Sequence, residues 1–86
     1  MADYKYALRR ELQGYNKCIV WRLDEENNFI EPLEGYVDYR RNVVKIYKNH
    51  RKVDLVALLN IVPIRLVKGL TESQRAALVH EGKIPS

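Results

Sequence analysis

The chain has 86 residues, of which 47% are hydrophobic and 30% charged, and this composition excludes a wholly disordered or low-complexity protein. We expect one globular domain over residues 1–86, with a formal net charge of +4 that mildly favours polyanionic partners. The single cysteine, Cys18, excludes an internal disulfide, and its apolar surroundings predict a small buried side chain.

The N-terminal residues lack the apolar core of a signal peptide, and no apolar stretch approaches the ~20 residues that a bilayer-spanning helix needs. A small secreted domain would more often carry several cysteines. We therefore expect a cytoplasmic protein that does not contact a membrane.

Residues 3–13 form the first predicted element, a helix. Asp3 is a residue type that caps helix N-termini, and Gly14 stands where a helix commonly ends. A strand is the alternative, because tyrosine also favours strands. Four apolar or aromatic residues recur at helical spacing: Tyr4, Leu8, Leu12 and Tyr15.

Residues 17–23 predict a strand, because their apolar side chains alternate in direction. Ile19, Trp21 and Leu23 share a face without polar residues, so this face should meet the core. We expect Trp21 to be a large core side chain.

Residues 24–35 predict a long acidic connection. The segment from Asp24 to Glu34 holds five acids and no base. Phe29, Ile30 and Leu33 interrupt its polarity, and we expect them to hold the loop against the domain.

Residues 36–48 predict a β-hairpin, because they are rich in β-branched and aromatic residues. A two-residue loop at Arg41-Asn42 would place Tyr36 opposite Tyr47; a three-residue loop is the alternative, since arginine is not a preferred turn residue. One face would then be apolar, with Val37, Tyr39, Val44 and Ile46. The other face would carry Tyr36, Asp38, Arg40, Val43, Lys45 and Tyr47.

The C-terminal third predicts two helices with a short strand between them. Residues 51–60 place several leucines on one face, with Asp54 as a cap, and Pro63 prevents continuation. Residues 64–68 alternate weakly, as a strand would. Residues 72–81 form the second helix, because Thr71 and Gln74 have capping-box spacing and a glycine follows at the end.

These elements predict an α+β fold: an antiparallel sheet of three to four strands packed against two to three helices. The expected core comprises Leu8, Leu12, Ile19, Trp21, Leu23, Val37, Val44, Ile46, Leu55, Leu58, Leu59, Leu78 and Val79.

Motifs for chemistry are absent from the sequence. One cysteine and two distant histidines do not make a zinc pattern, and no glycine-rich phosphate loop or Gly-x-Ser-x-Gly element occurs. We therefore expect a protein that is not an enzyme and has no metal or other cofactor. A metal-independent ribonuclease is the weaker alternative, because suitable acid–base groups follow one another at Tyr47, Lys48, His50 and Arg51.

The basic residues of the hairpin suggest a partner. From Arg40 to Lys52 the chain holds six bases and no acid, interleaved with tyrosines. Cations suit phosphates and aromatic rings stack on bases, so we expect a small accessory or regulatory protein that binds single-stranded DNA or RNA. A simple solvated sheet face would have the same composition. The candidate residues are Tyr36, Arg40, Arg41, Lys45, Tyr47, Lys48, Arg51 and Lys52.

The alternative from another class is a protein-binding module, a small inhibitor or adaptor of a larger protein. The acidic loop could expose a mixed apolar and acidic patch that docks on a larger protein, or a sheet edge could add to a partner's sheet. The same surfaces could join two copies of the chain into a homodimer. The candidate residues are Glu25, Glu26, Phe29, Ile30 and Leu33.

Overall fold

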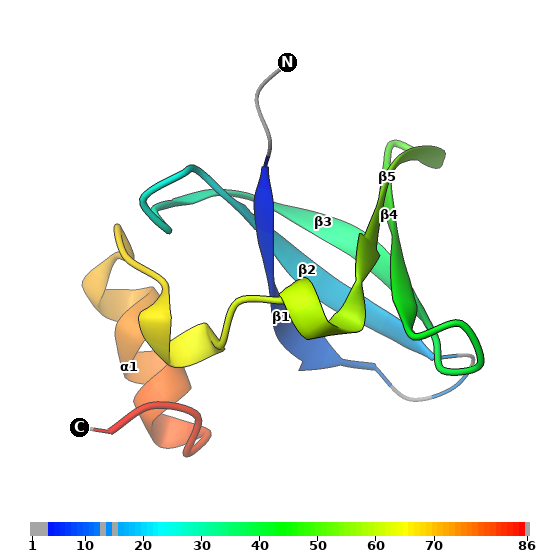
Figure 1. Cartoon of the computed structure of the whole chain (residues 1–86). Helices are drawn as coiled ribbons and strands as arrows, with labels where there is room; N and C mark the ends of the chain where they lie inside the picture. Colours follow the sequence, from blue (N-terminus) through cyan, green and yellow to red (C-terminus); the bar gives the residue numbers. More distant parts are fainter. Residues whose placement is uncertain (1–3, 13, 15, 86) are drawn as a thin grey trace.

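The computed structural model describes residues 4–12, 14 and 16–85 (Figure 1). Its centre is a five-stranded antiparallel sheet in the order β1-β2-β3-β4-β5, so each strand pairs with its neighbours in sequence. The strands are β1 (Lys5–Glu11), β2 (Lys17–Leu23), β3 (Phe29–Asp38), β4 (Val43–Lys48) and β5 (Arg51–Ala57). The helices of the described residues are the 3-10 turns η1 (Leu58–Asn60) and η2 (Ile64–Leu66) and the α-helix α1 (Glu72–His80).

The expected balance of helix and sheet is wrong. The described chain contains five strands and one α-helix, instead of three to four strands packed against two to three helices. The predicted helix 3–13 is strand β1, and the predicted helix 51–60 is strand β5 followed by η1. The predicted strand 64–68 contains η2, and most of the predicted loop 24–35 belongs to β3.

A β-bulge interrupts each of the three strands that differ from the expectation from sequence. Arg9 in β1, Ile30 in β3 and Val53 in β5 are extra residues that face no partner in the ladder. A bulge shifts the side-chain alternation by one residue. The period of two that identifies a strand in sequence is therefore broken in all three.

The β3–β4 hairpin forms in a different register from the expected one. Val37 pairs with Val44 and Tyr36 pairs with Lys45, so the connection is the four residues 39–42. The shift moves the pairing by two residues, which leaves Val37, Val44 and Ile46 on one buried face. Tyr39 leaves that face and lies in the turn, 57% exposed.

Strand β2 and helix α1 are confirmed. The Thr71 hydroxyl accepts from the Gln74 backbone N–H, and the Gln74 side chain accepts from the Thr71 N–H, which completes the capping box. At the other end Lys83 N–H donates to the Leu78 carbonyl, and Gly82 adopts φ 76°. This is a Schellman C-cap, in which glycine takes the left-handed conformation.

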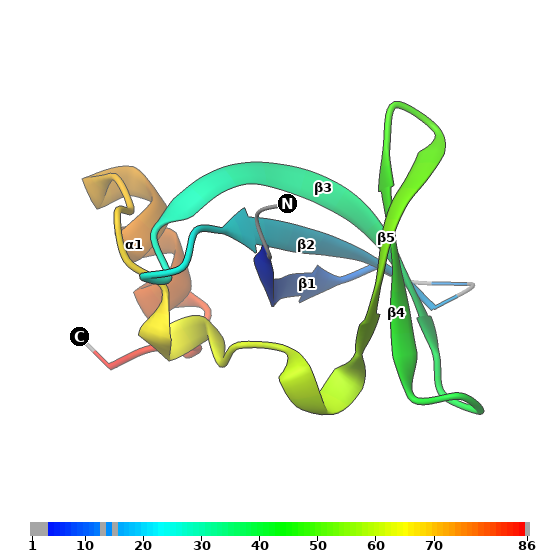
Figure 2. The ribbon, with the colours of Figure 1, turned by 45° about the horizontal axis from the view of Figure 1, so that its top comes forward.

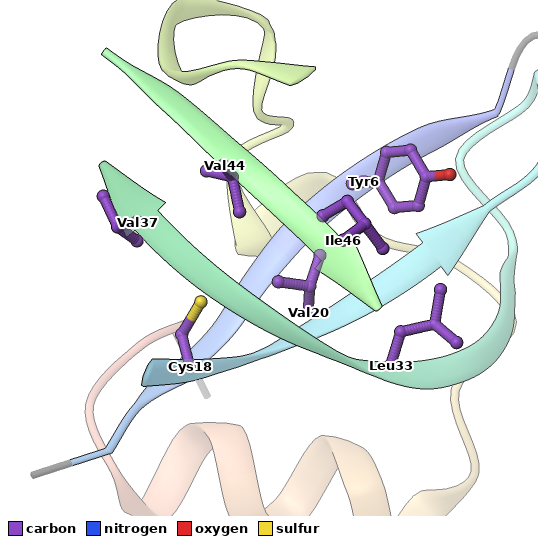
Figure 3. Close-up of a cluster of buried hydrophobic side chains, with 7 residues drawn as sticks. All are labelled: Tyr6, Cys18, Val20, Leu33, Val37, Val44 and Ile46. Carbon is purple, nitrogen blue, oxygen red and sulfur yellow. The ribbon is translucent and has the colours of Figure 1, made fainter. Parts of the chain in front are cut away.

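An inner hydrophobic cluster fills the concave side of the curled sheet (Figure 3). Val20, Val44 and Ile46 point toward one another from β2 and β4. Gly35 lies where β3 passes between them, and an added Cβ would approach Val20 Cγ2 to 2.5 Å. The buried members are Tyr6, Cys18, Val20, Leu33, Val37, Val44 and Ile46.

An outer hydrophobic cluster covers the opposite side of β1 and β2. Trp21 and Leu23 face Leu78 of α1 and Val67 of the segment before it. The Val62 N–H donates to the Tyr6 carbonyl at 2.8 Å, so the chain returns to β1 after η1. Helix α1 therefore lies at the end of the molecule opposite the β4–β5 hairpin (Figures 1 and 2).

Several details of the expected core change. Leu55 and Leu59 are 51% and 87% exposed, because β5 and η1 turn them away from both clusters. Cys18 is fully buried as expected. Asp3 and Tyr15, which supported the predicted first helix, lie outside the described residues.

No helix within the described ranges is both long and apolar enough to span a membrane.

Candidate nucleic-acid interface

The outer side of β3 and β4 carries the predicted tyrosines and one lysine. Val37, Val44 and Ile46 point into the inner cluster, so the residues that alternate with them point outward. Tyr36 and Lys45 are direct partners in the ladder, and Tyr47 lies diagonally across from Tyr36. The three side chains are half-buried and belong to neither hydrophobic cluster.

The two tyrosine rings contact each other. Their centroids are 5.3 Å apart and their planes meet at 84°, an edge-to-face geometry. A shallow hollow of about 420 Å³ lies over Tyr36, Lys45 and Tyr47, with Glu34 and His50 completing its rim. The two tyrosines and Lys45 therefore line one shallow hollow.

The other predicted cations divide between the two ends of β4. Arg40 and Arg41 lie in the β3–β4 turn, where their backbone N–H groups donate to Asp38 Oδ1 at 3.1 and 3.2 Å. Lys48, Arg51 and Lys52 lie at the opposite end, and all five side chains are exposed. Six extended residues span about 20 Å, so the two groups of cations are separated by about that length of β4, with Lys45 between them.

The turn at the Lys48 end has a defined conformation. Asn49 and His50 have φ values of 51° and 65°, and they join the paired residues Lys48 and Arg51. Two central residues with positive φ make a type I′ turn, the type that matches the twist of a hairpin. The turn places His50 on the rim of the hollow.

Lys48 lies two residues after Ile46, so its side chain points to the inner side of the sheet, where Glu31 neutralises it. The Glu31 carboxylate lies 3.0 Å from Lys48 Nζ and 2.9 Å from Arg22, so one acid serves two cations. The hydrogen bond from Lys48, with a contribution from Arg22, holds the pKa of Glu31 below its ordinary value. Among the described residues, Arg40, Lys45, Arg51 and Lys52 form no ion pair, whereas Arg41 lies 3.9 Å from Asp38.

The candidate ribonuclease residues are only partly assembled. Tyr47 and His50 line the same hollow, whereas Lys48 contacts Glu31. Arg51 is exposed beside the turn. A neighbouring hollow of about 490 Å³ is lined by Tyr47, Lys48 and His50 together with Glu31 and Glu34, whereas Arg51 does not line it.

The alternative protein-docking residues do not form one exposed patch. Phe29 packs on Trp21, with ring centroids 4.7 Å apart, and Leu33 is buried in the inner cluster. Glu25 and Glu26 are exposed in the β2–β3 turn, and Ile30 is exposed at its bulge. The turn itself is fastened by hydrogen bonds between Asn28 and Asp24.

Glu34 is a site residue that sequence reasoning missed. It alternates with Tyr36 along β3 and pairs with Tyr47, which places its carboxylate on the same outer face. The spacing of two residues could have identified it, had the segment before Tyr36 been read as strand. Glu34 is exposed, and it forms no ion pair with another described residue.

In the described part of the chain, no three His, Cys, Asp or Glu side chains come together in a way that could hold a metal ion. Comparisons with models of protein families, with curated proteins and with solved structures found no significant match.

Proposed function

We propose that this protein binds single-stranded nucleic acid, without catalysis, through the outer face of its β3–β4 hairpin and the adjoining turns. The observation that carries the proposal is the pairing of Tyr36 and Tyr47 around Lys45, between exposed cations at both ends of β4. We expect it to act in the cytoplasm as a small accessory or regulatory protein. The eight residues named from the sequence are the proposed contacts.

Physical chemistry supports a single strand over a duplex. An unpaired base exposes its ring, and stacking on an aromatic side chain contributes roughly 1–3 kcal/mol per base. Bases within a duplex are already stacked on one another and would leave the tyrosines unused. The tyrosine hollow should therefore favour single-stranded DNA or RNA.

The salt dependence of binding gives a quantitative expectation. Five cations of the face are not committed to Glu31: Arg40, Arg41, Lys45, Arg51 and Lys52. If each contacts one phosphate, log affinity should fall with log salt at a slope of about −3.5. Lys48 should contribute less, because Glu31 already accepts its hydrogen bond.

The test is fluorescence anisotropy with labelled single-stranded DNA, RNA and duplex DNA over a salt series. Saturable binding to a single strand, with the expected slope, supports the proposal. Absence of binding at low salt contradicts it. Incubation of unlabelled RNA with the protein in EDTA shows at the same time whether cleavage accompanies binding.

Two triple variants locate the interface. Arg40→Glu, Lys45→Glu and Lys52→Glu together should abolish binding, because three contacts are lost and three repulsions are added. The matched control is Arg65→Glu, Lys68→Glu and Arg75→Glu, which makes the same charge change on exposed residues outside the hairpin. Equal losses in both variants would mean that net charge, and not this face, determines binding.

A further inference from the structure

A second concave surface lies away from the tyrosine hollow, between the edges of β1 and β5. It is a groove of about 840 Å³, bounded by β5 residues 53–57 on one side and by Tyr4, Lys5 and Tyr6 on the other. Arg22 and the segment 60–63 contribute to its lining, and Leu66 of η2 stands at its border. The groove thus brings together parts of the chain that are far apart in sequence.

The walls of this groove mix polar residues with apolar side chains that are open to solvent. Among the described residues, seven large hydrophobic side chains are exposed, and four of them line this groove. A soluble domain rarely gathers exposed apolar side chains at one place without a binding role. The four are Tyr4 (44% exposed), Val53 (44%), Leu55 (51%) and Leu66 (46%).

One wall is a strand edge. Among the described residues, strand β5 pairs only with β4, and the hydrogen bond from Leu58 N–H to the Asn42 carbonyl sets the alternation of its backbone groups. By this alternation the N–H and carbonyl groups of Leu55 and Ala57 point away from β4. Asp54 Oδ1 already accepts the Leu55 N–H at 2.7 Å, so Ala57 offers the freer N–H.

The groove also carries an excess of positive charge. The Arg22 side chain is only 12% exposed, and its buried Nε has no hydrogen-bond partner among the described residues. Its single acidic partner, Glu31, is shared with Lys48. Across the groove, Asp54 accepts a hydrogen bond from the Tyr6 hydroxyl. The lining thus holds two cations and one acid, in which Lys5 Nζ also donates to the Glu25 carbonyl and the Arg22 guanidinium lies 4.4 Å from the centroid of the Tyr4 ring.

We propose that this groove binds an extended peptide segment of a partner protein, with aliphatic side chains and one carboxylate. The carboxylate contacts Arg22, and the aliphatic side chains pack on Val53, Leu55 and Leu66. The backbone of the peptide lies along β5, the mode in which peptides add to a free sheet edge. Charge complementarity selects an acidic segment, because the lining carries two cations and one acid.

The experiment first selects peptides that bind the protein and then tests whether they bind in this groove. A phage-displayed library of random short peptides is panned against the full chain, and an enriched peptide is resynthesised with its acidic residue or with the corresponding amide. We expect enriched peptides to combine aliphatic residues with Asp or Glu, and the amide version to bind the wild-type protein about tenfold more weakly. The amide comparison tests the role of Arg22 without any risk to folding.

Variants of exposed residues place the peptide in the groove. Leu66→Glu and Val53→Glu should each weaken binding about tenfold or more. Leu59→Glu is the matched control, because Leu59 is 87% exposed and does not line the groove. Leu66→Glu should affect oligonucleotide binding no more than Leu59→Glu, which makes the same charge change, so this proposal stands or fails independently of the nucleic-acid interface.

Three results would overturn the proposal. They are a panning experiment without enrichment, peptide binding that neither Leu66→Glu nor Val53→Glu weakens, and equal affinity for the acidic and amide peptides. Sedimentation of the protein alone provides a further check. A dimer that Leu66→Glu dissociates would show that the occupant is a second copy of the chain.

Discussion

The two ends of the sheet differ in what covers their outer face. Over β1 and β2 the returning chain and α1 bury Trp21, Leu23 and Leu78. Over β4 and its neighbours the outer face remains open, with half-buried tyrosines and a lysine. One end is therefore built as a layered core, and the other presents a surface.

The sequences of the strands reflect this difference. Strand β2 is buried on both faces, so buried residues such as Cys18, Val20 and Trp21 occur on both sides of the strand. Its polar residues, Lys17 and Arg22, lie at or next to its ends. Strand β4 is buried on one face, so Val44 and Ile46 alternate with polar or amphipathic residues. Burial on both sides identifies the structural end, and alternation identifies the end where binding is proposed.

The largest effect is expected from a substitution in α1, the helix that covers β1 and β2. Leu78→Ala should lower the free energy of unfolding by about 2–5 kcal/mol, because Leu78 is fully buried between α1 and β2. Leu59→Ala should change it by less than about 0.5 kcal/mol, since Leu59 is 87% exposed. Urea unfolding measures both, and similar losses would mean that α1 adds little to the core.

A second test concerns the contact that joins the two ends. The Tyr6 hydroxyl of β1 donates to Asp54 of β5 at 2.8 Å, and burial together with this hydrogen bond raises the pKa of Tyr6 to about 12. A raised pKa favours the neutral phenol in the folded state, so its contribution is complete below pH 10 and is lost as pH rises toward 12.

The wild-type protein should therefore lose about 2 kcal/mol more stability than Tyr6→Phe between about pH 9 and 11.5. The measurement is urea unfolding of both proteins at several pH values. The comparison with Tyr6→Phe is necessary because burial also raises the pKa of Cys18, to about 11. Parallel pH profiles for the two proteins would show that the pKa of Tyr6 is the same in the folded and the unfolded state.

A third test acts where β3 passes from the covered end to the open end. Gly35→Ala should destabilise the fold by about 1–3 kcal/mol, because the new methyl group would meet Val20 Cγ2 at 2.5 Å and Cys18 Sγ at 2.9 Å. In a double-mutant cycle, Gly35→Ala should cost less in the Val20→Ala background than in the wild-type protein, because the shorter side chain makes room. An equal cost in both backgrounds would locate the strain in the backbone of β3.

The smallest effect is expected on the open face. Glu34→Gln removes a negative charge from the rim of the tyrosine hollow, so affinity for a single-stranded oligonucleotide should rise a few-fold at low salt. Glu72→Gln, at an exposed position on α1, is the control for net charge. Anisotropy measures both variants, and a loss of affinity in Glu34→Gln would indicate that the carboxylate contacts the ligand directly.

The bulges decide which parts of the fold can be read from the sequence. Strands β2 and β4 have no extra residue, and their alternation predicted them correctly. In β1 and β5 the extra residues Arg9 and Val53 break that alternation, and the remaining apolar positions coincide with helical spacing. Helix α1 could be predicted because both of its ends carry local capping signals.

The candidate sites follow the same logic. The placement of Tyr36, Lys45 and Tyr47 on one face could be predicted, because a two-residue change of register preserves side-chain direction. The groove could not, because Tyr4, Arg22 and Leu66 become neighbours only when the whole sheet has curled. No local pattern in the sequence records that contact.

The meander topology has a consequence for how the molecule folds. Neighbouring strands can pair through short turns, whereas the contacts that close the structure span the chain: the Tyr6–Asp54 and Arg9–Glu81 hydrogen bonds are 48 and 72 residues apart in sequence. Local hairpins should consequently form before the rate-limiting barrier, and closure with docking of α1 should follow it. Leu78→Ala would then accelerate unfolding in stopped-flow experiments and leave the refolding rate nearly unchanged, so α1 would govern how long the native state persists.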